Sequence, residues 1–209
     1  MLQWLRAHGC VWCGRTCVEA ARRGRLEVLR WAREHSAPWY ETSISEAAAS
    51  GGHLEVIQYV WELGCEWHHG LCEAAACGGH LEVLKWVREQ GCPWDETEMC
   101  AIAGCVGHLE MLQWVRKHEC PWPEGLCTVA ARRGHLEVLK WARGNGCPWD
   151  ETRICATAAC SGHLGVLQWA REQDCPWDSE HGSNASCRSR GGWPPGGDAM
   201  GAGSRVPVD

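Results

Sequence analysis

The fold is decided by the stretch Gly134-His135-Leu136-Glu137-Val138-Leu139-Lys140-Trp141, which is followed by Gly146-Cys147-Pro148-Trp149-Asp150-Glu151-Thr152. It recurs almost unchanged from Gly79, and looser copies begin at Gly24, Gly52, Gly107 and Gly162. The spacing between successive glycines alternates between two values that differ by one residue. A nearly fixed period of this size indicates stacked structural repeats. We therefore expect residues 1–178 to form one array, in which a partial repeat over residues 1–23 precedes the six units.

The sequence pattern of each unit predicts two helices. In residues 26–34, Val28, Leu29 and Ala32 share one face and charged residues share the other, which is typical of a half-buried helix. We call this the Leu-rich helix; its end is expected at a left-handed glycine such as Gly64, Gly91 or Gly146. An Ala-rich helix follows each turn, and its N-caps are expected at Thr42, Thr97 and Thr152.

The alternating spacing indicates a longer, two-repeat block, because Gly24, Gly79 and Gly134 are evenly spaced and Gly52, Gly107 and Gly162 keep the same interval. The chain is thus predicted to be an all-α solenoid of stacked helix-turn-helix repeats. Residues 179–209 are rich in Gly, Ser, Pro and Arg and poor in aliphatic residues, so we expect a disordered C-terminal tail. Because the array starts and stops within a repeat, we also expect either a longer parent array or ends that associate with something.

Composition narrows the class of partner and the compartment. The formal net charge of −6 argues against a nucleic-acid partner, and no apolar run is long enough for a membrane span. The stretch Met1 to Cys10 lacks the apolar core of a signal peptide, so secretion is not expected. The sixteen cysteines recur with the repeat, and we interpret them as reduced thiols of a cytoplasmic or nuclear protein.

The order of Ala130-Ala131, Gly134-His135, Val138-Leu139 and Gly146 resembles an ankyrin repeat, and the resemblance covers roughly residues 9–178. It implies stacked helix pairs that bind other proteins through turn tips and the exposed face of the Ala-rich helix. The units are shorter than the family's usual length of about 33 residues. Thr-Arg-Ile-Cys at 152–155 also replaces the family's Pro-Leu-His. The shortening falls between the Leu-rich helix and the next Ala-rich helix, where the family carries its β-hairpin finger, so we expect a clipped finger. The implied function is a non-catalytic scaffold or adaptor with no cofactor and no small-molecule substrate.

Two tryptophan columns, meaning tryptophans at equivalent positions of successive repeats, run through the array. One lies in the Leu-rich helices (Trp4, Trp31, Trp86, Trp114, Trp141 and Trp169, with Tyr59 as the substitute) and one in the turns (Trp12, Trp39, Trp67, Trp94, Trp122, Trp149 and Trp177). We interpret both as packing between repeats. The alternative is an aromatic platform for bases or a proline-rich peptide. A histidine column (His53, His80, His108, His135 and His163) is expected to start helices and to hydrogen-bond across the turn.

The cysteines also form columns, one in the turns (Cys10, Cys65, Cys92, Cys120, Cys147 and Cys175) and one in the Ala-rich helices (Cys17, Cys72, Cys100, Cys127 and Cys155). Members of one column are too far apart for a disulfide or a shared zinc, because helices pack about 8–10 Å apart. We therefore interpret them as small buried hydrophobes. The weak metal candidate is His8, Cys10, Cys13 and Cys17, and the runner-up function is a metal- or redox-responsive Cys-rich protein.

No nucleophile with its base and no phosphate loop is recognisable, so no catalysis is expected. The candidate partner-binding residues are charged groups at the ends of the Ala-rich helices and an irregular histidine pair: Glu41, Asp95, Glu96, Glu124, Asp150, Glu151, Arg22, Arg23, Arg132, Arg133, His68 and His69. We expect the acidic residues, with Asp178, to line one edge that meets a basic segment of a partner protein. The alternative is a solvated edge that confers only solubility.

Overall fold

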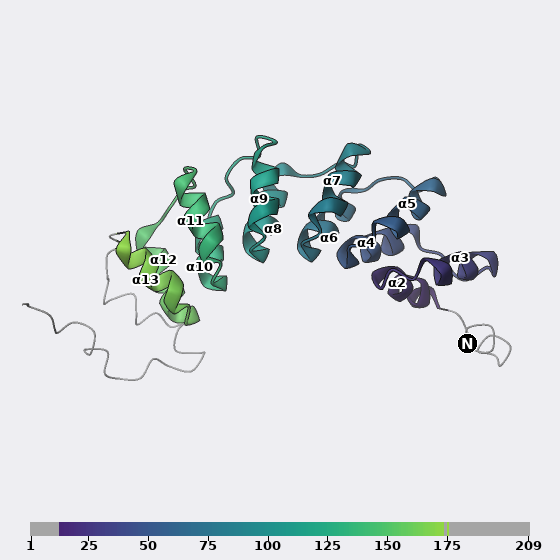
Figure 1. The fold of residues 1–209 in the computed structure, drawn as a ribbon, viewed down its shortest axis with the longest axis horizontal. Helices are drawn as coiled ribbons and strands as arrows, with labels where there is room; N and C mark the ends of the chain where they lie inside the picture. Colours follow the sequence, from purple (N-terminus) through teal and green to yellow (C-terminus); the bar gives the residue numbers. More distant parts are fainter. Residues whose placement is uncertain (1–12, 174, 176–209) are drawn as a thin grey trace, which may run out of the picture.

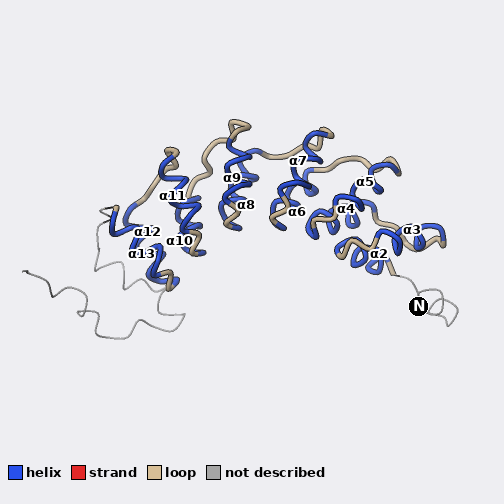
Figure 2. The backbone as a smooth tube through the Cα atoms, in the orientation of Figure 1, coloured by secondary structure: helices blue, strands red, loops and turns tan. Residues whose placement is uncertain are grey.

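The computed structural model describes residues 13–173 and 175, and these residues form helices and loops without a strand (Figures 1 and 2). The Ala-rich helices are α2 (Gly14–Arg22), α4 (Glu41–Gly51), α6 (His69–Gly78), α8 (Glu96–Val106), α10 (Leu126–Arg133) and α12 (Glu151–Ser161). The Leu-rich helices are α3 (Leu26–Glu34), α5 (Leu54–Glu62), α7 (Leu81–Glu89), α9 (Leu109–Arg116), α11 (Leu136–Gly144) and α13 (Leu164–Glu172). The prediction of an all-α chain is confirmed. The expected tail and the expected partial repeat before Cys13 lie outside the described residues.

Each Ala-rich helix packs on the Leu-rich helix that follows it, and from here on such a pair is called a repeat; neighbouring repeats meet through their Ala-rich helices. Figure 1 shows these pairs following one another along an arc. The contact between neighbouring Ala-rich helices is close because alanine and cysteine fill it, for example Ala75, Ala76 and Cys72, which are all fully buried. Among the described residues, no helix has both the length and the apolar character needed to cross a bilayer.

The Gly-His pair of the repeat forms a contact between repeats. Gly107 has a φ of +87°, and a Cβ at this position would overlap the ring of His135 in the next repeat. Nε2 of His135 lies 3.0 Å from the carbonyl oxygen of Cys105, at the end of α8. His53, His80 and His163 contact backbone carbonyls of the preceding repeat in the same way. The histidines start helices, as predicted, and their hydrogen bonds reach backbone carbonyls of the preceding repeat.

The tryptophan columns meet at each junction between repeats. Trp122 lies with Arg116 of its own repeat 4.2 Å above its ring and with Trp141 of the next repeat at a centroid distance of 5.8 Å. The same edge-to-face contact joins Trp67 to Trp86 and three further pairs: Trp39–Tyr59, Trp94–Trp114 and Trp149–Trp169. The described turn tryptophans pack against the core and are half-buried. This confirms packing between repeats as a role of both columns.

The helix ends correct the expected caps. Asp95 and Asp150 are the N-caps of α8 and α12, and their carboxylates accept bonds from backbone N–H groups at 2.8 and 3.0 Å. Thr97 and Thr152 lie inside these helices, and Thr42 lies inside α4, whose N-cap is Tyr40. An aspartate placed two residues earlier therefore takes the role predicted for threonine.

The left-handed glycines at the ends of the Leu-rich helices are confirmed. Gly64, Gly91 and Gly146 have φ values of 84°, 85° and 76° and follow the C-cap residues directly. Two other repeats place non-glycine residues in the same position, Ser36 with a φ of 55° and Glu119 with a φ of 60°. A side chain in this region is strained by about 1–2 kcal/mol.

Candidate functional site: the acidic edge of the Ala-rich helices

The N-terminal ends of successive Ala-rich helices lie along one edge of the array. Ser45, in the first turns of α4, contacts His68, the N-cap of α6, at 3.5 Å. At the opposite ends of the same two helices, a Cβ on Gly78 would lie 2.6 Å from the carbonyl oxygen of Ser50. Neighbouring Ala-rich helices therefore run in the same direction, and their starting residues gather on one side.

This edge carries exposed carboxylates, which we call the acidic edge: Glu41, Asp95, Glu96, Glu124, Asp150 and Glu151. Glu41, Glu96 and Glu151 are the first residues of α4, α8 and α12, where a negative charge also stabilises the helix dipole. Asp95 and Asp150 already hold a backbone N–H as N-caps. The glutamates are thus the acidic-edge groups whose carboxylates are freest to meet a partner.

The candidate arginines lie at the other end of the Ala-rich helices. Arg22 and Arg133 end α2 and α10, Arg132 precedes Arg133, and Arg23 is the C-cap of α2. All four are exposed, and Arg22 lies 3.9 Å from Glu19 of the same helix. The acidic and basic candidates therefore lie at opposite ends of the Ala-rich helices. Asp178 lies outside the described residues.

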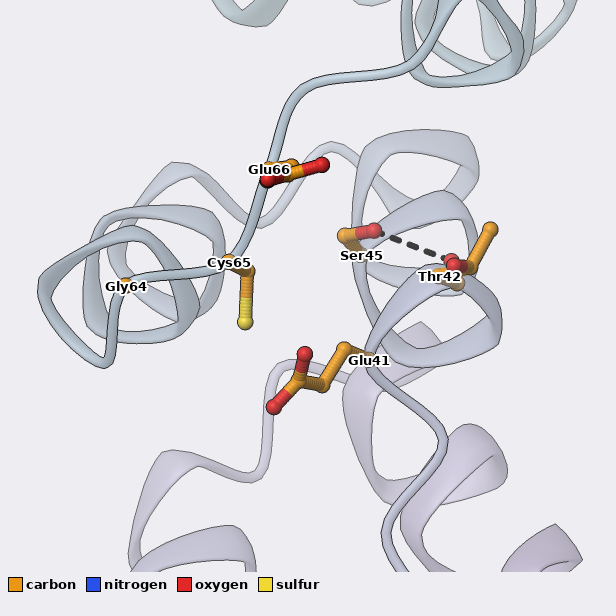
Figure 3. A pocket seen from close by; sticks show the side chains of 6 residues that line it. All are labelled: Glu41, Thr42, Ser45, Gly64, Cys65 and Glu66. Atoms are coloured by element: carbon orange, nitrogen blue, oxygen red, sulfur yellow. Dashed lines mark hydrogen bonds between the residues drawn. The ribbon is translucent and has the colours of Figure 1, made fainter.

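A cavity of about 410 Å³ opens at the acidic edge between α4 and the turn that follows α5 (Figure 3). Its lining residues are Glu41, Thr42, Ser45, Gly64, Cys65 and Glu66. In Figure 3 the side chains of Glu41 and Cys65 point toward each other across this space. Burial and the nearby Glu41 carboxylate raise the pKa of the Cys65 thiol to about 11, so the thiol stays protonated near neutral pH. The two charged side chains that line the cavity, Glu41 and Glu66, are therefore both carboxylates.

The cavity lies where the sequence departs from the repeat. Ser45 occupies the position of the cysteine column in the other Ala-rich helices. Glu66 stands where five other turns have proline, and His68-His69 stand where other units have Asp-Glu, Tyr-Glu or Pro-Glu. Only the histidines were noted from the sequence. The replacement of a column cysteine by Ser45 was a signal that could have located the cavity.

Ser45, His68 and Glu46 lie in a row that superficially resembles a nucleophile with its base and orienting acid. His68 Nε2 is 3.5 Å from Ser45 Oγ, and His68 Nδ1 is 3.6 Å from Glu46 Oε1. Both distances exceed the range of about 2.6–3.2 Å at which such groups work. The Ser45 hydroxyl donates its proton to the carbonyl oxygen of Thr42 at 2.9 Å. Its proton is therefore not directed at the imidazole, and the row serves to hold the start of α6.

The other candidates are placed more simply. His69 is the first residue of α6 and is exposed. Of the weak metal candidate, Cys13 is exposed and contacts Thr16 at 3.8 Å, and Cys17 is buried in the core, while His8 and Cys10 lie outside the described residues. Within residues 13–173 and 175, no three His, Cys, Asp or Glu side chains are grouped so that they could hold a metal ion.

The cysteine columns pair with each other. The thiol of Cys127 in α10 donates to Cys147, after α11 of the same repeat, with 3.2 Å between the sulfurs. Three other thiol pairs have the same offset in sequence, and in each the second thiol raises the pKa of the first: Cys72–Cys92, Cys100–Cys120 and Cys155–Cys175. The Cys92 thiol donates to the carbonyl oxygen of His68 at 3.4 Å. The prediction that cysteines of the same column do not contact one another does not apply to cysteines of different columns, because here a helix cysteine contacts a turn cysteine. The constant offset was visible in the sequence and was missed.

Comparisons with known proteins add no family to this description. No protein-family model matches the chain, and no curated protein matches it significantly.

Proposed function

We propose that this chain is a non-catalytic protein–protein interaction scaffold, an ankyrin-like solenoid of short repeats that acts in the cytoplasm or nucleus. The observation that carries the proposal is the acidic edge, with its cavity at the point where three departures from the repeat converge. A repeat that served stacking alone would not need Glu66 in place of proline. The thirteen free thiols among the described residues support a reducing compartment, although Cys160 is disulfide-bonded.

The partner is a protein that presents a basic segment along the acidic edge. A lysine or arginine side chain of this segment enters the cavity, where Glu41 and Glu66 lie on its walls. An extended segment then runs past the exposed starts of α8 and α12, where Glu96 and Glu151 are placed. Charge complementarity of this kind governs association rate and specificity and is weakened by salt.

The test is the binding of a lysine- and arginine-rich peptide to the full chain, followed by fluorescence anisotropy at two salt concentrations. The edge variant carries Glu41→Lys, Glu96→Lys and Glu151→Lys. Its matched control changes three exposed glutamates of the Leu-rich helices, Glu27, Glu55 and Glu110, to lysine. Both variants have the same net charge, so they separate a located site from general attraction.

We expect the edge variant to lose at least about tenfold in affinity, which corresponds to about 1.4 kcal/mol, and the control to lose much less. Equal losses in both variants would show that net charge alone attracts the peptide. Unchanged binding in the edge variant would show that the acidic edge is only a solvated surface. A Glu66→Pro variant, which restores the common turn residue, tests the cavity separately and is expected to weaken binding with a smaller change of charge.

A further inference from the structure

The four thiol pairs lie in the same place in four successive repeats but fall into two classes. The pairs Cys72–Cys92 and Cys127–Cys147 occupy equivalent positions of successive two-repeat blocks. The pairs Cys100–Cys120 and Cys155–Cys175 belong to the intervening repeats and are likewise equivalent to each other. The classes differ in the charges around the sulfurs.

In the first class the turn thiol is favoured as a thiolate. The hydrogen bond donated by Cys127 lowers the pKa of Cys147, and the positive charge of Arg116 lowers it further against the effect of burial. The neighbouring Cys72 thiol and Arg88 also act to lower the pKa of Cys92, although the Cys92 thiol donates to the carbonyl oxygen of His68 at 3.4 Å. In the Cys127–Cys147 pair, the direction of the hydrogen bond makes Cys147 the nucleophile and Cys127 its proton donor.

In the second class the surroundings oppose ionisation. Burial, followed by the neighbouring Cys120, raises the pKa of Cys100 to about 12. Burial and the nearby Glu96 carboxylate raise the pKa of Cys120, although the neighbouring Cys100 thiol and the positive charge of Arg116 act to lower it. Burial raises the pKa of Cys155 to about 12, and Glu151 adds to the effect. The glutamates that start α8 and α12 thus lie close enough to act on these thiols.

We propose that Cys127–Cys147 is an oxidisable dithiol, which hydrogen peroxide converts into a disulfide that joins α10 to the turn after α11. The sulfurs of Cys127 and Cys147 are 3.2 Å apart and need to approach to the disulfide length of about 2.0 Å. Oxidation needs only these two sulfurs, whereas a structural zinc site needs four ligands. The inference does not depend on the proposed scaffold function.

The reaction proceeds in two balanced steps. The thiolate sulfur of Cys147 attacks one oxygen of the peroxide, the O–O bond breaks, and a sulfenic acid and hydroxide form. The thiol sulfur of Cys127 then attacks the sulfenic sulfur, the S–O bond breaks, and the proton of Cys127 leaves with the departing oxygen as water. The hydroxide takes up the proton that Cys147 had released. Two thiols and one peroxide thus give one disulfide and two waters.

Access also favours the Cys127–Cys147 pair. Cys147 is 6% exposed and Cys127 1%, whereas Cys72 and Cys92 are both fully buried. Hydrogen peroxide is small, but it must still reach the attacking sulfur. The Cys127–Cys147 pair is therefore more accessible to the oxidant than Cys72–Cys92.

The test maps disulfides in the full chain. The reduced protein is exposed to hydrogen peroxide for increasing times, the remaining thiols are alkylated, and peptides are identified by mass spectrometry without reduction. A Cys127–Cys147 linkage is expected to appear faster than Cys100–Cys120, because the pKa of Cys147 is lowered and that of Cys120 is raised, which gives Cys147 the larger thiolate fraction. Dithiothreitol should reverse it. Cys17 and Cys65 are internal controls, because Ala37 and Ser45 stand where their partner thiols would be.

Two variants sharpen the test. Cys127→Ser is expected to stop the reaction at a sulfenic acid on Cys147, trapped by dimedone. Cys120→Ser should leave the Cys127–Cys147 linkage unchanged. The proposal is overturned if the wild-type chain, with its far-UV circular dichroism retained, forms no Cys127–Cys147 linkage. It is also overturned if all four pairs oxidise at equal rates.

Discussion

Replacing Gly107 by alanine should break a contact between repeats. Gly107 has a left-handed φ of +87°, and a Cβ on it would meet the ring of His135 in the next repeat. The strain of the left-handed conformation costs about 1–2 kcal/mol. Displacing the ring also loses its hydrogen bond to the Cys105 carbonyl, which contributes about 0.5–1.5 kcal/mol. We expect Gly107→Ala to lower the free energy of unfolding by about 1.5–3.5 kcal/mol in total.

Gly162 provides the matched control. It occupies the same position in its repeat and ends α12 with a φ of +76°. Among the described residues, no atom lies within 4 Å of the place that an alanine methyl group would take there. Gly162→Ala should therefore cost only the backbone strain, about 1–2 kcal/mol. The difference between the two variants measures the contact with the following histidine.

The assay is urea unfolding followed by far-UV circular dichroism, with the double variant Gly107→Ala/His135→Ala included. Removing the ring removes the overlap, so the two substitutions should couple by about 0.5–1.5 kcal/mol. Equal costs for Gly107→Ala and Gly162→Ala would refute the reasoning. So would additivity in the double-mutant cycle, because either result would mean that the histidine ring does not occupy the space above the glycine.

Three further outcomes are expected from urea unfolding of single variants. Asp150→Ala should destabilise the chain by about 1 kcal/mol because α12 loses its N-cap bond, whereas Asp150→Asn should keep most of the stability. Glu119→Gly should stabilise by about 1 kcal/mol because it relieves a left-handed φ of 60°, whereas Glu119→Gln should not. The free energy of unfolding should fall as the pH rises from about 8.5 to about 12. The unfolded chain then loses protons that thiols such as Cys100, with its pKa raised to about 12, retain when folded, at about 1.4 kcal/mol per pH unit for each thiol.

Each outcome has a result that would contradict it. Equal losses in the alanine and asparagine variants of Asp150 would show that its carboxylate does not cap α12. Equal gains in the glycine and glutamine variants of Glu119 would assign the effect to charge rather than backbone strain. For the alkaline transition, Cys100→Ala should flatten the decline between about pH 9 and 12. An unchanged slope would mean that this thiol ionises equally in the folded and unfolded chain.

The helices themselves could be predicted because period and apolar faces repeat. Because the repeats are so similar, the sequence does not indicate which repeat a given side chain contacts. His135 has an equivalent turn in its own repeat and in the preceding one, and only the structure shows that its hydrogen bond goes to Cys105 of the preceding repeat. The N-caps at Thr97 and Thr152 were misplaced because a helix start two residues earlier lets an aspartate reach the third backbone N–H.

The candidate site was only partly visible in the sequence. The placement of Glu96 and Glu151 at helix starts follows from the repeat and is seen in the structure. The cavity depends instead on how Ser45 and Glu66 face each other across two chain segments, which no spacing reveals. The Cys127–Cys147 contact depends on the angle at which two helices of one repeat meet. The positions that indicate the site are those where a different residue replaces the usual residue of a column, as Ser45 does.

The glycine–histidine contacts also determine how the array could be shortened by engineering. Removing residues 79–133 deletes one two-repeat block and brings His135 to the position that His80 now holds above Gly52. This deletion leaves a histidine ring above each glycine and preserves the alternation of the two classes of thiol pair. Deleting a single repeat keeps a histidine above each glycine but places two repeats of the same class next to each other. Block deletions should therefore yield shorter proteins that unfold cooperatively, and single-repeat deletions should leave one mismatched junction.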